Sequence, residues 1–231
     1  MKTRKPVLLR IVAAFAIAGS SLLAFAVDSG ASMSADDALA QLVMGNQFYA
    51  SGSLGNLVAN SRPKIRQRLA AGQQPYAIVL GCSDSRVPPE IVFNKGLGEV
   101  FPIRVAGNVL APHETGSIQY ALEHLGSRLI VVLGHEKCGA VTAAVTCKNN
   151  PVCADDPIAF YEPSAIGNIV IDILPSVQGA DVEASVVENV LSMVEALDAD
   201  PVVEELRAKG EIIEVVGAKY DLDTGIVTIL P

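Results

Sequence analysis

Residues 128–141 read RLIVVLGHEKCGAV, and this stretch decides the fold. Its first seven residues form an almost unbroken apolar run that closes on a glycine, which is typical of a strand buried on both faces. A helix is expected to follow over 138–145. A second apolar run, YAIVLG at 76–81, leads into the polar segment CSDSR and predicts another buried strand. Buried strands that alternate with helices indicate an α/β fold with a largely parallel sheet.

The same pattern continues along the chain. A third strand is expected over 99–108, although Pro102 weakens it. The runs EIIEVVGAKY (211–220) and GIVTIL (225–230) flank DLDTG and predict an antiparallel hairpin. Helices are expected over 34–49, 63–71, 115–125, 181–197 and 201–209. The predicted fold is therefore a mostly parallel central sheet flanked by helices, with an antiparallel hairpin element near the C-terminus.

The first 26 residues have the features of a signal peptide. Four basic residues precede or border an apolar segment at 11–18, and Ala24-Phe25-Ala26 is a small-x-small cleavage site. An uncleaved membrane anchor is the alternative, but the 17 residues from 11 to 27 are short for a span, which needs roughly 20. We expect cleavage, no stable membrane insertion afterwards, and a single periplasmic or secreted domain over 27–231.

Charge excludes two classes of partner. The full chain has a formal net charge of −8, and removing the four basic residues of the signal segment takes it to −12. Nucleic acids and anionic membrane surfaces are polyanions, so neither is expected to bind this chain.

The four cysteines divide into two pairs. Cys147 and Cys153 lie in the polar stretch TCKNNPVCADD with five residues between them, and an oxidising compartment favours a disulfide. Two free thiols or two further metal ligands remain alternatives. Cys82 and Cys138 are then left over, and a lasting free thiol in such a compartment needs a metal or strict burial.

Three candidate metal ligands follow two of the predicted strands directly. Cys82 follows 76–81, and His135 and Cys138 follow 128–134. Because parallel strands end at the same edge of a sheet, we expect the three side chains to meet there. Two thiolates and an imidazole suit zinc, and three protein ligands with a fourth position open are typical of a catalytic site. Asp84 can accept a hydrogen bond at this position or bind the metal itself, and Arg86 can hold it in a bidentate pair.

The segments CSDSRV, RVAGN, GHEKCGAV and YDLDTG, in this order, resemble those of the β-class carbonic anhydrases. The resemblance covers nearly all of 27–231. It implies reversible hydration of carbon dioxide to bicarbonate and a proton through zinc-bound hydroxide, with zinc on Cys82, His135 and Cys138. It also implies Asp84 and Arg86 as a catalytic dyad, with Asp84 as a fourth zinc ligand in a closed state, and Gly139 as a candidate substrate contact. A homodimer or larger homo-oligomer is implied as well.

Two alternatives stay open at this point. One is a zinc hydrolase that acts on another small electrophile, such as carbon disulfide, on the same scaffold. The other is a non-catalytic zinc or thiol protein in which Cys82 and Cys138 form a disulfide.

Overall fold

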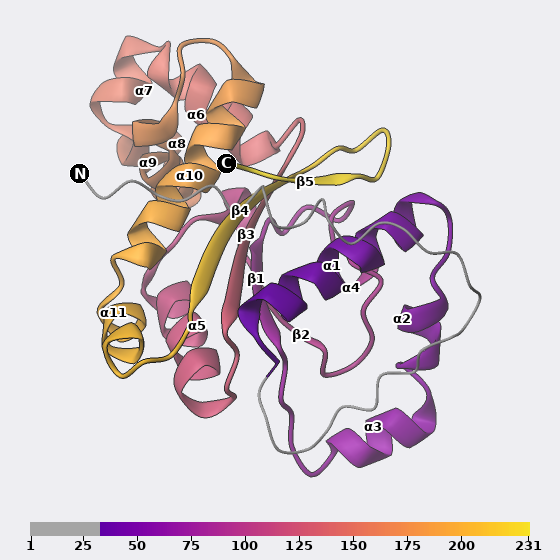
Figure 1. Ribbon diagram of the computed structural model, residues 1–231. Coiled ribbons are helices and arrows are strands. Elements are labelled where there is room, and N and C mark those ends of the chain that lie inside the picture. Colours follow the sequence, from indigo (N-terminus) through magenta and orange to yellow (C-terminus); the bar gives the residue numbers. More distant parts are fainter. Residues whose placement is uncertain (1–32) are drawn as a thin grey trace. The chain divides into compact units, whose positions relative to one another are not determined.

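The computed structural model describes residues 33–231, in which helices alternate with the strands of one central sheet (Figure 1). The predicted signal peptide lies outside the described residues. Within them, no helix is both long enough and apolar enough to cross a lipid bilayer. The strands are β1 Ala77–Gly81, β2 Val100–Arg104, β3 Leu129–His135, β4 Glu214–Tyr220 and β5 Val227–Ile229. The helices are α1 Ala35–Ala50, α2 Gly55–Ala59, α3 Pro63–Leu69, α4 Pro89–Val92, α5 Pro112–His124, α6 Gly139–Lys148, α7 Pro151–Asp155, α8 Pro157–Tyr161, α9 Ile166–Ile173, α10 Val182–Asp198 and α11 Pro201–Ala208, with 3₁₀ turns η3 Ala106–Asn108 and η4 Leu174–Ser176.

The sheet has the strand order β2-β1-β3-β4-β5. Its first four strands are parallel to their neighbours, and β5 pairs with β4 in the antiparallel sense. Gly81 at the end of β1 is paired with Leu133 of β3, so both strands end at the same edge. The predicted fold class is therefore confirmed, including the antiparallel hairpin.

Side chains of the central strands point alternately into two hydrophobic clusters, one on each face of the sheet. Ala77 and Val79 of β1 point to the face covered by α1 and α4. Ile78 and Leu80 point to the opposite face, which is covered by α5, α10 and α11 (Figure 1). Every residue of β1 and β3 is buried, as continuous apolar runs between two helical layers require.

The boundaries differ from the predictions where local polar groups intervene. β2 ends at Arg104, because the chain turns into η3, where Gly107 has a φ of +73°. The segment 151–161 forms α7 and α8, although the sequence analysis treated this region as a polar loop. Asn150 and Asp156 cap these helices by accepting backbone N–H groups, and each is followed by a proline at the first helical position.

One buried amide fastens α1 to the rest of the domain. Asn46 Nδ2 donates to the backbone oxygens of Val92 and Gly225, and its Oδ1 accepts the N–H of Val227. The hairpin turn depends on Asp221, whose Oδ1 accepts the N–H groups of Asp223 and Thr224. The hairpin predicted at DLDTG is therefore present.

Candidate metal centre

The ends of β1 and β3 bring the three predicted ligands together. Cys82 follows the last residue of β1, His135 ends β3, and Cys138 is the N-cap of α6. All three are buried, and their two sulfurs and one ring nitrogen lie within 4.8 Å of one another. This arrangement follows from the parallel pairing of β1 with β3, since one edge of the sheet presents both strand ends.

The imidazole of His135 is oriented by the backbone. Its Nδ1 lies 2.8 Å from the Glu136 carbonyl oxygen, which can only accept, so Nδ1 carries the proton. The other ring nitrogen, Nε2, is buried and has no hydrogen-bond partner among the described residues. A buried lone pair beside two sulfurs is what a metal ligand requires, and the backbone bond to the other nitrogen is the usual way of fixing the ring.

The two thiols interact with each other. Hydrogen bonding with Cys138 lowers the pKa of Cys82, and the same interaction together with burial raises the pKa of Cys138. The backbone amides of Val141 and Ala140, in the first turn of α6, act in the opposite direction on the pKa of Cys138. A divalent metal can replace a thiol proton, because the thiolate is the form that binds.

The donor set fits zinc. Two cysteine sulfurs and one histidine nitrogen are ligands that zinc prefers, and three protein ligands leave one tetrahedral position for a small molecule. The orphaned Nε2 of His135 gives independent support, because a buried nitrogen without a partner is otherwise unfavourable.

Asp84 and Arg86 form a bidentate pair next to this donor set. Arg86 Nε donates to Asp84 Oδ1 at 2.9 Å, and Nη2 donates to Oδ2 at 2.6 Å. These hydrogen bonds hold the pKa of the Asp84 carboxyl well below its usual range. Oδ2 lies 3.9 Å from His135 Nε2, so the ionised carboxylate borders the space between the three donor atoms and solvent.

The comparisons with known proteins agree with this geometry. The sequence profile of the family described as "Carbonic anhydrase" matches residues 77–227, which include strands β1 to β4, the first residue of β5 and every residue of the donor set. The chain belongs to the β-class carbonic anhydrase family. Members of this family catalyse the reversible hydration of carbon dioxide, and this chain is a carbonic anhydrase.

Curated and solved relatives support the assignment. "Carbonic anhydrase 2" of Mycobacterium tuberculosis is 38% identical over 160 residues, which cover 69% of this chain and 76% of that protein. The structure of the β-carbonic anhydrase CcaA matches with a TM-score of 0.56 and 27% identity, over 84% of this chain and 95% of that one. A structure of one of two tetrameric β-carbonic anhydrases of Sordaria macrospora shares the fold, with a TM-score of 0.55, 24% identity and coverage of 84% and 97%.

Arg104 is a residue of this carbonic anhydrase site that the sequence analysis missed. It ends β2, and its guanidinium donates to the backbone oxygens of Cys82 at 3.1 Å and Asp84 at 2.6 Å. The guanidinium therefore holds the backbone that carries both a ligand and the dyad carboxylate. The sequence did contain a signal for Arg104. It is a charged residue at the end of the strand next to β1, and parallel neighbouring strands end at the same edge of the sheet.

The turn between His135 and Cys138 is held from outside. Lys137 has a φ of +52°, and its N–H donates to Glu183 Oε1 of α10 at 2.9 Å. Lys219 of β4 pairs with Glu183 at 2.7 Å. Sequence spacing alone does not identify Glu183, because it lies more than 40 residues beyond the ligands.

A cluster of three carboxylates nearby does not resemble the Cys-His-Cys donor set. Glu136, Asp221 and Asp223 bring carboxylate oxygens within 4.8 Å of one another. Lys219 pairs with Glu136 at 3.6 Å and Lys137 pairs with Asp223 at 3.4 Å, so neighbouring cations compensate these charges.

The remaining predicted residues lie around α6. Gly139 begins this helix next to Cys138, and a Cβ built at Gly139 would meet no atom within 4 Å. Cys147, at the other end of α6, is bonded to Cys153 of α7 with both sulfurs buried.

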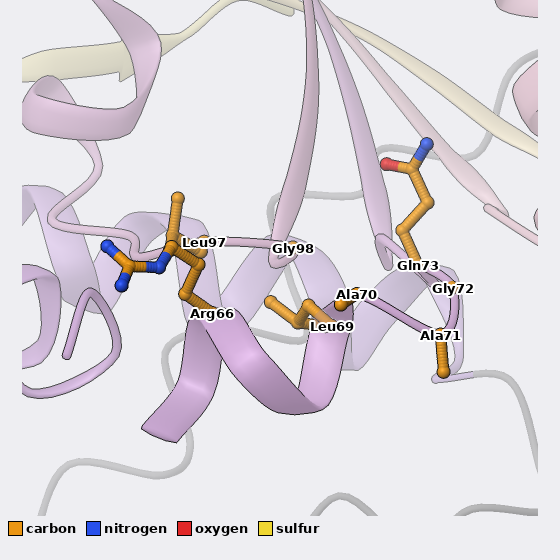
Figure 2. Close-up of a pocket in the computed structure, with 8 residues that line it drawn as sticks. All are labelled: Arg66, Leu69, Ala70, Ala71, Gly72, Gln73, Leu97 and Gly98. Atoms are coloured by element: carbon orange, nitrogen blue, oxygen red, sulfur yellow. The ribbon is translucent and has the colours of Figure 1, made fainter. Parts of the chain in front are cut away.

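The hollow in Figure 2 lies elsewhere in the molecule. It has a volume of about 570 Å³ and is lined by Arg66, Leu69, Ala70, Ala71, Gly72, Gln73, Leu97 and Gly98. These residues belong to α3 and to the segments that precede β1 and β2. The hollow is therefore at the opposite edge of the sheet, and none of the predicted site residues lines it.

Proposed function

We propose that this carbonic anhydrase holds zinc on Cys82, His135 and Cys138 and uses Asp84, paired with Arg86, to orient the reacting water. The observation that carries the proposal is the orphaned, buried Nε2 of His135, which lies beside two cysteine sulfurs and 3.9 Å from Asp84 Oδ2. When bound, zinc supplies Lewis acidity, which lowers the pKa of water toward neutrality.

The role of Asp84 follows from its protonation state. Because Arg86 keeps the carboxylate ionised, its oxygens can only accept hydrogen bonds. With zinc held by Cys82, His135 and Cys138, Asp84 Oδ2 would accept a hydrogen bond from the reacting water and so orient it toward carbon dioxide. Arg104 keeps Asp84 in place through the backbone.

The surroundings suit a small apolar substrate. Cys82 and Cys138 are part of a hydrophobic cluster that includes Val87, Val109 and Ile173. Gly139 adds no side chain at the exposed start of α6, which leaves room for carbon dioxide to approach. Apolar walls with few polar groups are typical of sites that bind small uncharged molecules.

The assay is zinc stoichiometry combined with stopped-flow hydration of carbon dioxide over about pH 6.5 to 9. We expect one zinc per chain and a hydration rate that rises with pH. Cys138→Ala is expected to lose the metal. One zinc per chain without hydration, together with turnover of carbon disulfide, would contradict the proposed reaction. A Cys82–Cys138 disulfide in protein that contains no zinc would contradict the proposed metal site.

We also propose that the chain is exported and that its signal segment is removed near residue 26, leaving a single domain over 27–231. The composition of 1–26 supports this proposal, as does the Cys147–Cys153 disulfide, because such bonds persist in oxidising compartments. The test is N-terminal sequencing of the protein recovered from the periplasm or medium of a bacterium that expresses the full chain. An intact N-terminus in the cytoplasmic fraction would contradict export.

A homo-oligomer is proposed as the working form. Exposed apolar side chains on α1 and α2 support it, with Met44, Phe48 and Val58 exposed by 40%, 50% and 59%. Side chains of this size gain about 1.5–3 kcal/mol each from full burial. Sedimentation equilibrium of the wild type and of Phe48→Glu is the test, and a monomeric wild type at assay concentration would contradict the proposal.

A further inference from the structure

Helix α10 lies against β3, the turn between His135 and Cys138, and the η3 turn. Near its start, Glu183 accepts the N–H of Lys137, between His135 and Cys138. One turn later, Val186 and Val190 pack on Gly134, where a Cβ would lie 2.6 Å from Val190 Cγ2. Asn189, on the same face, reaches the η3 turn beyond β2. The helix therefore contacts β3, the ligand turn and η3.

The η3 contact leads directly to a ligand. Gly107 donates its N–H to Cys82 Sγ at 3.4 Å. The carbonyl oxygen of the same residue accepts from Asn189 Nδ2 at 2.9 Å. Gly107 is thus held on both sides, by the sulfur through its N–H and by α10 through its oxygen. A shift of Asn189 would therefore change the direction of the hydrogen bond from the Gly107 N–H to Cys82 Sγ.

The orientation of the Asn189 amide is fixed by this contact. Rotation of the amide by half a turn would place Oδ1 against the Gly107 oxygen, and two acceptors repel. In the orientation present, Oδ1 has no hydrogen-bond partner among the described residues, although Asn189 is only 1% exposed. An apolar side chain would avoid this unfavourable burial, as the buried Val186 and Val190 of the same helix do.

We propose that Asn189 is a positioning residue for the metal site: by holding the carbonyl of Gly107 it keeps the N–H of the same residue directed at Cys82, where it stabilises the thiolate and slows the loss of zinc. The inference rests on the proposed zinc site. Hydrogen bonds to a ligating sulfur draw electron density away from it, and outer partners of metal ligands strongly affect metal affinity. Asn189 itself touches neither substrate nor metal.

The test compares the full chain with Asn189→Leu and Asn189→Ala. The matched control is Ser192→Ala. Ser192 also lies on α10, and its replacement removes a hydrogen bond to Ser176 of η4 rather than one to Gly107. Zinc release is followed with an excess of a chromophoric chelator. The second readout is the sulfur-to-metal absorption band of the cobalt(II)-substituted proteins, which reports electron density on the thiolates rather than overall stability.

We expect both Asn189 variants to release zinc about tenfold faster than the wild type. Their cobalt(II) band should move to longer wavelength, because the thiolate that has lost an N–H donor is easier to oxidise. Ser192→Ala should match the wild type in both measurements. Circular dichroism identifies the variants that fold. If Asn189→Leu does not fold, Asn189→Ala alone is compared with the wild type.

Two results would overturn the inference while leaving the proposed function intact. One is zinc release within about twofold of the wild type together with an unmoved cobalt band. The other is the same change in Ser192→Ala, which would assign the effect to general loosening of α10. A wild type that binds no zinc would overturn the proposed function itself, and the inference with it.

Discussion

Replacing Gly107 with alanine should destabilise the protein by two separate effects. The residue has a φ of +73°, in the left-handed region that residues with a Cβ rarely adopt. A Cβ at this position would also lie 2.6 Å from Ile173 Cδ1 and 3.2 Å from Ala140 Cβ. The first distance is too short for two carbon atoms, so the Ile173 side chain or the η3 turn must move.

The two effects can be given magnitudes. A left-handed conformation costs a residue with a Cβ about 1–2 kcal/mol. Extra volume in a packed region costs a further 1–3 kcal/mol or so. We therefore expect Gly107→Ala to lower the free energy of unfolding by about 2–5 kcal/mol. Gly126→Ala is the matched control, because Gly126 has a φ of +74° and a Cβ there would meet nothing within 4 Å. It should lower the free energy by only about 1–2 kcal/mol.

Urea unfolding at fixed protein and zinc concentrations measures both variants, since bound metal and association shift apparent stability. Ile173→Val removes the clashing Cδ1 and alone costs about 0.5–1.5 kcal/mol. In combination with Gly107→Ala, it should recover about 1 kcal/mol relative to additive behaviour. Equal losses for Gly107→Ala and Gly126→Ala, together with an additive double variant, would refute the crowding argument.

Three further predictions concern the site and its support. Asp84→Asn should keep its zinc but lose most hydration activity near neutral pH, and full activity with normal metal content would contradict the role of Asp84. Burial raises the pKa of Glu183, but the Lys219 ammonium and the Lys137 N–H together more than offset this, so the pKa is lowered overall. These contacts stabilise the protein above the unfolded pKa of roughly 4.3. That contribution is lost as pH falls through the folded pKa, so the stability difference between wild type and Glu183→Gln should be larger at about pH 6 than at about pH 3.5, and a constant difference would contradict it. Replacing Cys147 and Cys153 together with serine should lower the free energy of unfolding by about 2 kcal/mol, as expected for a short closed loop, and reductant should then have no further effect on the melting temperature.

The fold could be predicted because its main signals are local. The apolar runs of β1 and β3 identify buried strands without reference to any other part of the chain. Parallel pairing then places whatever follows these strands at one edge, which brings Cys82 close to His135 and Cys138. The α7 and α8 helices were missed, because the same Asn-Pro and Asp-Pro pairs that start helices also occur in loops.

The supporting residues could not be predicted in the same way. Arg104, Glu183 and Asn189 act through backbone groups, and a backbone contact leaves no pattern in the partner's side chain. Asn189 is an amide on the buried face of α10, where most of the other buried residues are apolar. Its partner, Gly107, is 82 residues away and can be identified only once the packing of the helix is known.

The position of α10 in the chain also sets an order of events during synthesis. A ribosome makes a protein from its N-terminus, so Cys82, His135 and Cys138 all emerge before Val182–Asp198. Until that helix has been made, the ligand turn lacks Glu183, and Gly107 lacks Asn189. A nascent chain that ends before residue 182 therefore contains every metal ligand but not the helix that keeps them in place. With the zinc site and the role of Asn189 proposed above, lasting capture of the ion would be a late step in the maturation of this protein.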